Sequence, residues 1–323
     1  MKRVISVSLI SLLSVGVAQA SIYNFVTYTA EGAGLSVDAV GVNDNVAGTV
    51  SVELPAGALV QQAYLYSASV WSNALYDVVF EGATLTSNAS SRLDTGGKQA
   101  NGASENRWNV TGLVQAKVGG GSGLFDFSVT ELGYLDGEIL AVVYNIPTEP
   151  VRTAMIFDGE LATTGDSFNV TLSPAFDGSD VLMSLGISFG YQGSDQYTTV
   201  DINGQRLTSS AGGQDDGFSS NGGLITAGGI GDSIANPANP LALPTGPRSD
   251  DELYNLAPFL TIGNNGINIR TLNPSNDDNV FFMGLVATGQ AIPDNPAIPA
   301  PGAIVLAGIG AGIVSRLRRR QLL

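Results

Sequence analysis

The sequence predicts an all-β protein built from two tandem antiparallel β-sandwiches of the jelly-roll type. Short stretches of alternating apolar and polar residues recur about every eight to twelve residues, as strands of a sandwich do. Turn-forming residues separate these stretches, and the chain contains 41 glycines and 14 prolines. Charged residues make up 13% of the chain, well below the roughly 25% of an average globular domain. Long amphipathic helices are therefore not expected.

The first predicted sandwich covers residues 21–146. A polar, glycine-bearing stretch at residues 88–106 is expected to be a loop, and a short helix is expected near residues 113–118. Within residues 138–144, Ile139 to Val143 are apolar without alternation, so we expect this strand to be the most deeply buried. Strands are expected at residues 21–29, 35–40, 46–54, 60–71, 76–80, 83–86, 124–132 and 138–144.

The second predicted sandwich covers residues 147–290 and is set off by Pro147 and Pro150. The dipeptide Asn203-Gly204 predicts a type I′ hairpin. Residues 209–247 are poor in apolar side chains and are expected to form an exposed loop system. Strands are expected at residues 152–157, 167–172, 181–191, 198–202, 205–207, 254–262, 266–271 and 280–288.

Residues 1–20 have the pattern of a secretory signal peptide. Lys2 and Arg3 precede an apolar run, and Ala18 and Ala20 occupy the small-residue positions before a cleavage site. We expect cleavage before Ser21. The export machinery and signal peptidase are the partners that this pattern implies.

The last residues have the pattern of a membrane-spanning helix. Residues 291–298 form a proline-containing spacer, and residues 302–314 are almost entirely apolar or glycine. A helix over residues 302–317 would be roughly 24 Å long, and arginine side chains that reach outward could extend it to the bilayer thickness. Arginines at the end of the span would stay cytoplasmic, which places the body of the protein outside. The flanking residues are Pro299, Ala300, Pro301 and Gly302 before the span and Arg316, Arg318, Arg319 and Arg320 after it.

This order of features over residues 299–323 resembles the PEP-CTERM sorting signals of exosortase substrates, in the variant with Pro-Ala-Pro-Gly before the helix. Ala300 stands where the literal Pro-Glu-Pro signal has glutamate. The resemblance implies cleavage near residues 299–301 by an exosortase-like enzyme. It also implies delivery to the cell surface or to an extracellular polysaccharide matrix. The alternative is a plain C-terminal anchor that is never cut.

The body contains the segments Ala-Tyr-Leu-Tyr at 63–66, Asn-Val-Thr-Gly-Leu-Val at 109–114, Asp-Gly-Glu-Ile-Leu-Ala-Val-Val-Tyr at 136–144 and Phe-Asp-Gly at 157–159. In these segments it resembles, more loosely, a group of bacterial surface-protein β domains. This resemblance implies a structural or adhesive role and carries over no catalytic residues.

Charge and composition exclude several classes of function. The net charge is −15, and all 29 acidic residues lie between the two terminal segments, whereas six of the 14 basic residues lie within them. So acidic a body repels nucleic acids and attracts cations. The chain has no cysteine and no histidine, which excludes disulfides, Ser-His-Asp and Cys-His catalysis and the usual zinc sites.

Oxygen-rich clusters make calcium the cofactor to consider, although none has the spacing of an EF-hand. The densest carboxylates are Asp215 and Asp216 with Asp277 and Asp278. Similar clusters occur at residues 177–180 and 250–252. The alternative is that these are solvated turns in which Asp and Asn side chains bind their own backbone.

Two further kinds of site can be considered. Glu131, Asp136, Glu138 and Asp158 are the acids that could form a glycosidase pair, which needs two carboxyl groups about 5 to 9 Å apart. Trp71, Trp108 and Tyr134 are the aromatic residues that could bind extracellular polysaccharide, and the alternative for the tryptophans is packing in the core.

The sequence as a whole predicts a non-enzymatic, exported structural or adhesive protein of the cell surface or matrix. A calcium-dependent glycan-binding module is one alternative, and a secreted glycoside hydrolase is another.

Overall fold

The computed structural model describes residues 22–41, 46–69, 76–93, 104–159, 165–188, 198–211, 225–234, 252–273 and 279–294. Within these ranges the protein is all-β, with antiparallel pairing throughout, one α-helix and one 3₁₀ turn. No helix in the described ranges is long and apolar enough to cross a bilayer. Both predicted terminal segments, including the expected helix at residues 302–317, lie outside them.

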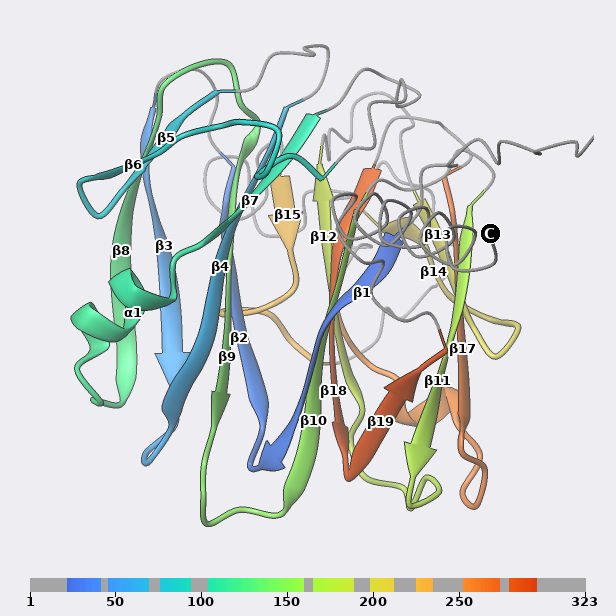
Figure 1. Ribbon diagram of the computed structural model, residues 1–323. Helices are drawn as coiled ribbons and strands as arrows, with labels where there is room; N and C mark the ends of the chain where they lie inside the picture. Colours follow the sequence, from blue (N-terminus) through green and yellow to red (C-terminus); the bar gives the residue numbers. More distant parts are fainter. Residues whose placement is uncertain are drawn as a thin grey trace, which may run out of the picture.

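Four sheets form four layers, which we number I to IV in the order in which they stack (Figure 1). Sheet I has the order β3-β8-β5-β6 and sheet II the order β2-β9-β4-β7. Their strands are β2 (Gly34–Val40), β3 (Ala47–Leu54), β4 (Leu59–Ser69), β5 (Val78–Phe80), β6 (Ala83–Leu85), β7 (Ser104–Asn109), β8 (Gly123–Glu131) and β9 (Gly137–Asn145).

Sheet III has the order β1-β10-β18-β12-β15, with β16 also paired to β12, and sheet IV has the order β14-β13-β17-β11-β19. Their strands are β1 (Ile22–Glu31), β10 (Val151–Gly159), β11 (Asp166–Ser173), β12 (Leu182–Ser188), β13 (Thr198–Ile202), β14 (Gln205–Ala211), β15 (Ile225–Ala227), β16 (Leu253–Asn255), β17 (Gly266–Leu272), β18 (Asn279–Thr288) and β19 (Gln290–Pro293).

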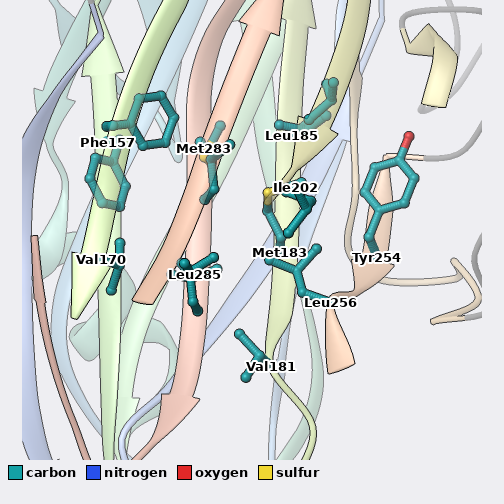
Figure 2. Close-up of a cluster of buried hydrophobic side chains, with 14 of the residues drawn as sticks. Phe157, Val170, Val181, Met183, Leu185, Ile202, Tyr254, Leu256, Met283 and Leu285 are labelled. Carbon is teal, nitrogen blue, oxygen red and sulfur yellow. The ribbon is translucent and has the colours of Figure 1, made fainter. Parts of the chain in front are cut away.

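Three apolar cores separate the four layers. The core between sheets I and II includes Leu65, Phe127 and Leu140, and it also receives Val114 and Val118 of the helix α1 (Thr111–Val118). The core between sheets III and IV includes Phe157, Met183 and Leu285 (Figure 2). A third core joins sheets II and III and contains the side chains of Tyr66, Ile139, Ile156, Phe281 and Phe282, among others.

The two halves of the described body repeat one strand order. Counting from β2, sheet II joins the first, eighth, third and sixth strands, and sheet I joins the second, seventh, fourth and fifth. Counting from β10 and leaving out β16 and β19, sheets III and IV repeat this order, and β1 is added at the edge next to β10. The first half therefore packs on the second through sheets II and III, and each of these sheets has a core on both faces.

Several predicted elements are confirmed. The strand expected at 138–144 is β9, in which Gly137–Val143 are all buried. The predicted hairpin joins β13 to β14, and Asn203 and Gly204 both have positive φ, 50° and 76°, as a type I′ turn requires. The short helix is α1, and Gly119 ends it in the left-handed conformation.

Four elements differ from the prediction. Strand β7 occupies the end of the expected loop at 88–106, and β15 lies within the expected loop system at 209–247. The strand expected at 254–262 is the short β16 followed by a 3₁₀ turn, Ala257–Phe259. The expected spacer at 291–298 contains most of β19, which pairs with β11. In these segments the strands are held by long-range pairing and their own apolar alternation is weak.

The structure also differs from the expected border between the two sandwiches at residue 146, because the first strand pairs with a strand of the second half. Strand β1 pairs along its length with β10, from Ile22 opposite Gly159 to Glu31 opposite Val151. The N-terminal strand is therefore part of sheet III in the second half. Its alternation indicates a strand but says nothing about which sheet the strand joins.

Candidate functional site

A cavity of about 430 Å³ lies at the seam between the two halves. This volume is within the range of roughly 300–1,000 Å³ that is usual for ligand sites. Glu53 and Pro55 are exposed and form the rim, whereas Leu54 and Ser184 are buried. The walls come from β2, β3, β9, β12, β16, β18 and the segment after β15, and they comprise Leu35, Ser36, Val37, Glu53, Leu54, Pro55, Tyr144, Leu182, Ser184, Gly228, Gly229, Ile230, Leu253, Gly284 and Val286.

Close backbone approach builds one wall of this cavity. The N–H of Ile230 donates to the carbonyl of Val37 at 2.9 Å, which attaches the segment after β15 to the edge strand β2. A Cβ atom on Gly229 would lie 1.9 Å from the Val37 carbonyl oxygen, so only glycine fits at this crossing. A Cβ on Gly284 of β18 would likewise lie 2.4 Å from a methyl carbon of Leu35.

Most polar groups of the cavity are already satisfied within the fold. Ser36 Oγ accepts from the Glu53 N–H at 3.0 Å, and Ser184 Oγ donates to the Gly228 carbonyl at 2.5 Å. The Tyr144 hydroxyl and the Glu53 carboxylate remain at the wall. Burial raises the pKa of Tyr144, the charge of Arg152 lowers it, and the charge of Glu53 raises it further. The arrangement can hold an apolar body with a polar group near Tyr144 and Glu53.

Beside the cavity, side chains of β2 close the edge of sheet I. The N–H of Ser51 on β3 donates to Asp38 Oδ2 at 2.5 Å, and Ser51 Oγ donates to Asp126 Oδ1 at 2.8 Å. Burial raises the pKa of Asp38 to about 6, backbone N–H groups oppose this shift, and the charges of Asp232 and Asp126 add to it. Together with Ser36, Asp38 thus replaces the backbone partners that the edge strand β3 lacks.

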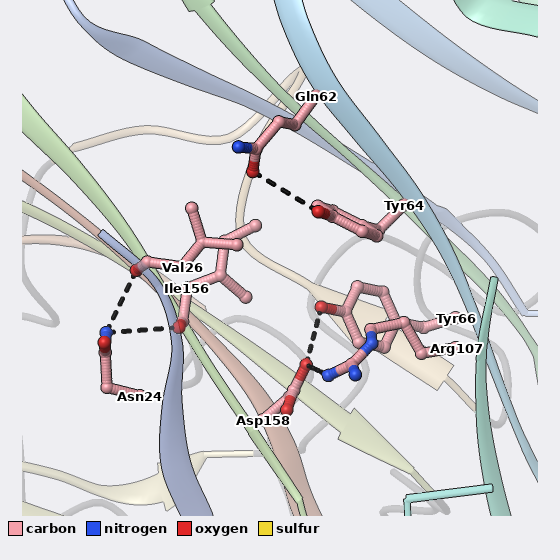
Figure 3. Close-up of polar contacts among 8 residues, drawn as sticks. All are labelled: Asn24, Val26, Gln62, Tyr64, Tyr66, Arg107, Ile156 and Asp158. Carbon is pink, nitrogen blue, oxygen red and sulfur yellow. Dashed lines mark hydrogen bonds and ion pairs between the residues drawn. The ribbon is translucent and has the colours of Figure 1, made fainter. Parts of the chain in front are cut away.

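A second cluster of polar side chains joins the two halves across the seam between sheets II and III (Figure 3). Arg107 of β7 forms an ion pair with Asp158 of β10 at 2.5 Å, and the Tyr66 hydroxyl donates to the same carboxylate oxygen at 2.9 Å. The guanidinium carbon of Arg107 lies 3.2 Å from the centroid of the Phe25 ring, a cation–π contact. Burial raises the pKa of Asp158, while Arg107 and Tyr66 act to lower it.

The predicted sorting and processing residues all lie outside the described residues, as do the predicted calcium ligands. This applies to Ala18, Ala20, Ser21, Pro299, Ala300, Pro301, Gly302, Arg316, Arg318, Arg319, Arg320, Asp215, Asp216, Asp277 and Asp278. The cluster at residues 177–180 is described, and there the Ser179 N–H donates to Asp177 Oδ1 at 2.9 Å. Such a bond within the cluster is that of a solvated turn. No group of three or more acidic side chains in the described ranges is arranged to hold a metal ion.

The four acids considered for glycoside hydrolysis are buried, and the structure does not bring all of them together. Glu138 alternates with Ile139 along β9 and so lies on the same face as Leu140, in the core of sheets I and II. Asp158 contacts Tyr66 in the seam, on the other face of sheet II. Glu131 and Asp136 are each 1% exposed.

The aromatic residues considered for glycan binding also separate. Trp108 is 8% exposed and packs in the core of sheets I and II, where its Nε1–H donates to the Thr86 carbonyl at 3.0 Å. This is the core packing given as its alternative. Tyr134 is 38% exposed, and Trp71 lies outside the described residues.

The sequence reasoning did not find the seam cavity or the Arg107–Asp158 pair. The walls of the cavity come from seven strands or segments spread over more than 250 residues, and no local pattern marks which of them meet. One weak signal was Gly228-Gly229, a glycine pair that precedes an apolar residue within a polar segment, and Gly222-Gly223 before Leu224 has the same pattern. Such a pair is compatible with close backbone approach.

Comparison with known proteins adds little to this picture. No protein-family model matches the chain, and no curated protein matches it. Among solved structures, the major capsid protein P2 from bacteriophage PM2 is similar with 11% sequence identity and a TM-score of 0.22, over 79% of this chain and 98% of that chain. A likeness this distant carries no argument about fold or function.

Proposed function

We propose that the chain is an exported structural or adhesive protein of the cell surface or extracellular matrix. In this proposal signal peptidase removes residues 1–20, and an exosortase-like enzyme cleaves near residues 299–301. The observation that supports it is the extent of the folded body. Within the described residues the first strand begins at Ile22 and the last ends at Pro293, so removal of both expected terminal signals would cut none of the strands described.

Each half of the body, in this proposal, is a jelly roll. Both halves share one strand order, which is that of two Greek keys wound into one sandwich. One sheet contains the first, eighth, third and sixth strands, and the sheet facing it contains the second, seventh, fourth and fifth. This supports a pair of jelly rolls fused side by side. Such a block presents its loops and outer sheets to the environment and suits a structural role.

A structural role is favoured over the hydrolase by the placement of the acids. All four candidate acids are at most 6% exposed and none lines the cavity, whereas a glycosidase needs two carboxyl groups in a cleft that admits the substrate. The body is therefore proposed to act without catalysis.

The test is the intact mass of the mature protein recovered from cells that make it, together with its fractionation. We expect a mass that corresponds to loss of both ends and recovery in the surface or matrix fraction. Replacing Arg316, Arg318, Arg319 and Arg320 with Ser should impair sorting or membrane retention, because the positive flank no longer fixes the orientation of the span. Arg270→Ser, an exposed change on β17, is the control and should be sorted normally. A mature protein in the cytosol with both ends attached would contradict the proposal.

A further inference from the structure

We propose that the seam cavity binds a single aliphatic chain that ends in a cationic amine. This site is independent of the sorting route proposed above. It rests on the volume of the cavity, on the aliphatic nature of its walls and on one carboxylate at its rim.

The walls select an aliphatic body. They contain Leu, Val, Ile and Pro side chains from both halves, and Tyr144 is the aromatic residue among them. Ser36 and Ser184 use their hydroxyl oxygens in hydrogen bonds of the fold, so they do not call for polar groups along the ligand. Burying an apolar chain against such walls releases water from both surfaces.

The size of the cavity sets the length of the chain. At about 30 Å³ for each water volume, 430 Å³ holds about fourteen such volumes. A methylene group needs about the same space as a water molecule. A chain of about ten carbons with its head group takes up about eleven such volumes and therefore fits within the cavity.

The rim selects a cationic head. Glu53 is the ionisable carboxylate among the lining residues, is exposed, and has no ion-pair partner among the described residues. The neighbouring Tyr144 hydroxyl offers a hydrogen bond, and the charge of Glu53 acts on that hydroxyl. Arg152 also acts on Tyr144 but is not part of the lining. A chain with a net charge of −15 adds a general attraction for cations.

Isothermal titration with n-decylamine below its aggregation concentration tests the site. We expect saturable 1:1 binding with a negative heat-capacity change, the mark of apolar burial. n-Octylamine should bind roughly tenfold more weakly, because two methylene groups fewer are buried. n-Decanoate should bind at least tenfold more weakly than n-decylamine, since Glu53 repels its carboxylate.

Two variants localise the binding. Glu53→Gln should weaken n-decylamine at least fivefold and leave n-decanol unchanged, whereas Glu149→Gln, at an exposed carboxylate away from the cavity, should change neither. Leu253→Trp fills the cavity and should weaken the binding of all four chains, with circular dichroism to confirm that the variant is folded. Non-saturable binding, equal affinity for decanoate, or an unchanged affinity in Glu53→Gln would each overturn the proposal.

Discussion

Glu138 is fully buried on β9, and neither of its carboxylate oxygens has a hydrogen-bond partner among the described residues. Burial alone raises its pKa from 4.5 to about 8, since a charged carboxylate loses its hydration in the core. The side chain is therefore neutral in the folded protein at neutral pH. In the unfolded chain it is ionised, so folding takes up a proton.

This difference gives stability a defined pH dependence. When the pKa of a carboxyl group is higher in the folded protein than in the unfolded chain, the native state is most stable below the pKa of the unfolded chain. That stability is lost as the pH rises through the pKa of the folded protein. Glu138 should therefore cost the native state roughly 1 kcal/mol per pH unit between about pH 5 and pH 8. Replacing Glu138 with Gln should remove that slope and leave the variant more stable than wild type at pH 8.

Urea unfolding at pH 5 and pH 8 measures the effect. The comparison is between the pH-dependent changes in unfolding free energy of the two proteins, because Asp38, with its pKa of about 6, also titrates in this window. Glu149→Gln, at an exposed carboxylate, should leave the slope as in wild type. If wild type and Glu138→Gln lose equal stability over this range, Glu138 is not the neutral buried acid described.

At the scale of elements, the edge of sheet I depends on side chains from the next sheet. Asp38 and Ser36 on β2 accept the N–H groups of Ser51 and Glu53 on β3. Free edge N–H groups invite pairing with other chains, so this closure protects the edge of β3 that faces β2.

Replacing Asp38 with Ala should expose the Ser51 amide. We expect its hydrogen exchange to accelerate roughly tenfold, because one charge-assisted hydrogen bond is lost while the strand stays in place. Amide exchange followed by NMR measures this. Ser36→Ala is the matched control and should accelerate the Glu53 amide instead. Unchanged exchange at Ser51 in Asp38→Ala would show that the closure does not depend on this contact.

The local sequence pattern was sufficient to predict most helices and strands, but it did not predict which strands pair with one another. Neighbouring residues determine burial, helix capping and turn type. The sequence could therefore predict β9, α1 and the Asn203-Gly204 hairpin. β15, with three residues in a polar segment, and β19, with a terminal proline, have little alternation of their own. They are strands because β12 and β11 offer free edges. Tertiary context overrides propensity in such short strands.

At the scale of the whole molecule, the seam makes the two halves one folding unit. Sheets II and III share a core, and the Arg107–Asp158 pair crosses it. Neither inner sheet can expose that face to water without losing the burial of large side chains such as Tyr66 and Phe282.

The body should therefore unfold in a single calorimetric transition, with equal calorimetric and van't Hoff enthalpies. Arg107→Leu leaves Asp158 buried without its cation, which should cost about 3 kcal/mol, and it should shift the whole transition to lower temperature without splitting it. Differential scanning calorimetry checks both expectations. Two separate transitions, with one insensitive to Arg107→Leu, would show that the halves fold independently.

The candidate site could not be predicted for a related reason. Leu35, Leu253 and Val286 meet at the cavity only because β2 lies over β15 and β18, and that arrangement follows from the strand order of both halves. Composition excludes histidine and cysteine chemistry, because this exclusion depends only on the absence of both residue types from the sequence. The position of a cavity depends on long-range packing, and alternation along one strand does not encode it.

The pairing of β1 with β10 has a consequence for the order in which the protein can be made. A chain is synthesised, and leaves any translocation pore, with its N-terminus first, yet Ile22 finds its neighbour only when Gly159 arrives. Until then, the leading strand has no sheet to join. The side chains of β9 that face sheet III are covered even later, when Phe281 and Phe282 are synthesised almost at the end of the body. Factors that shield nascent apolar strands would therefore matter for this protein through nearly the whole of its synthesis.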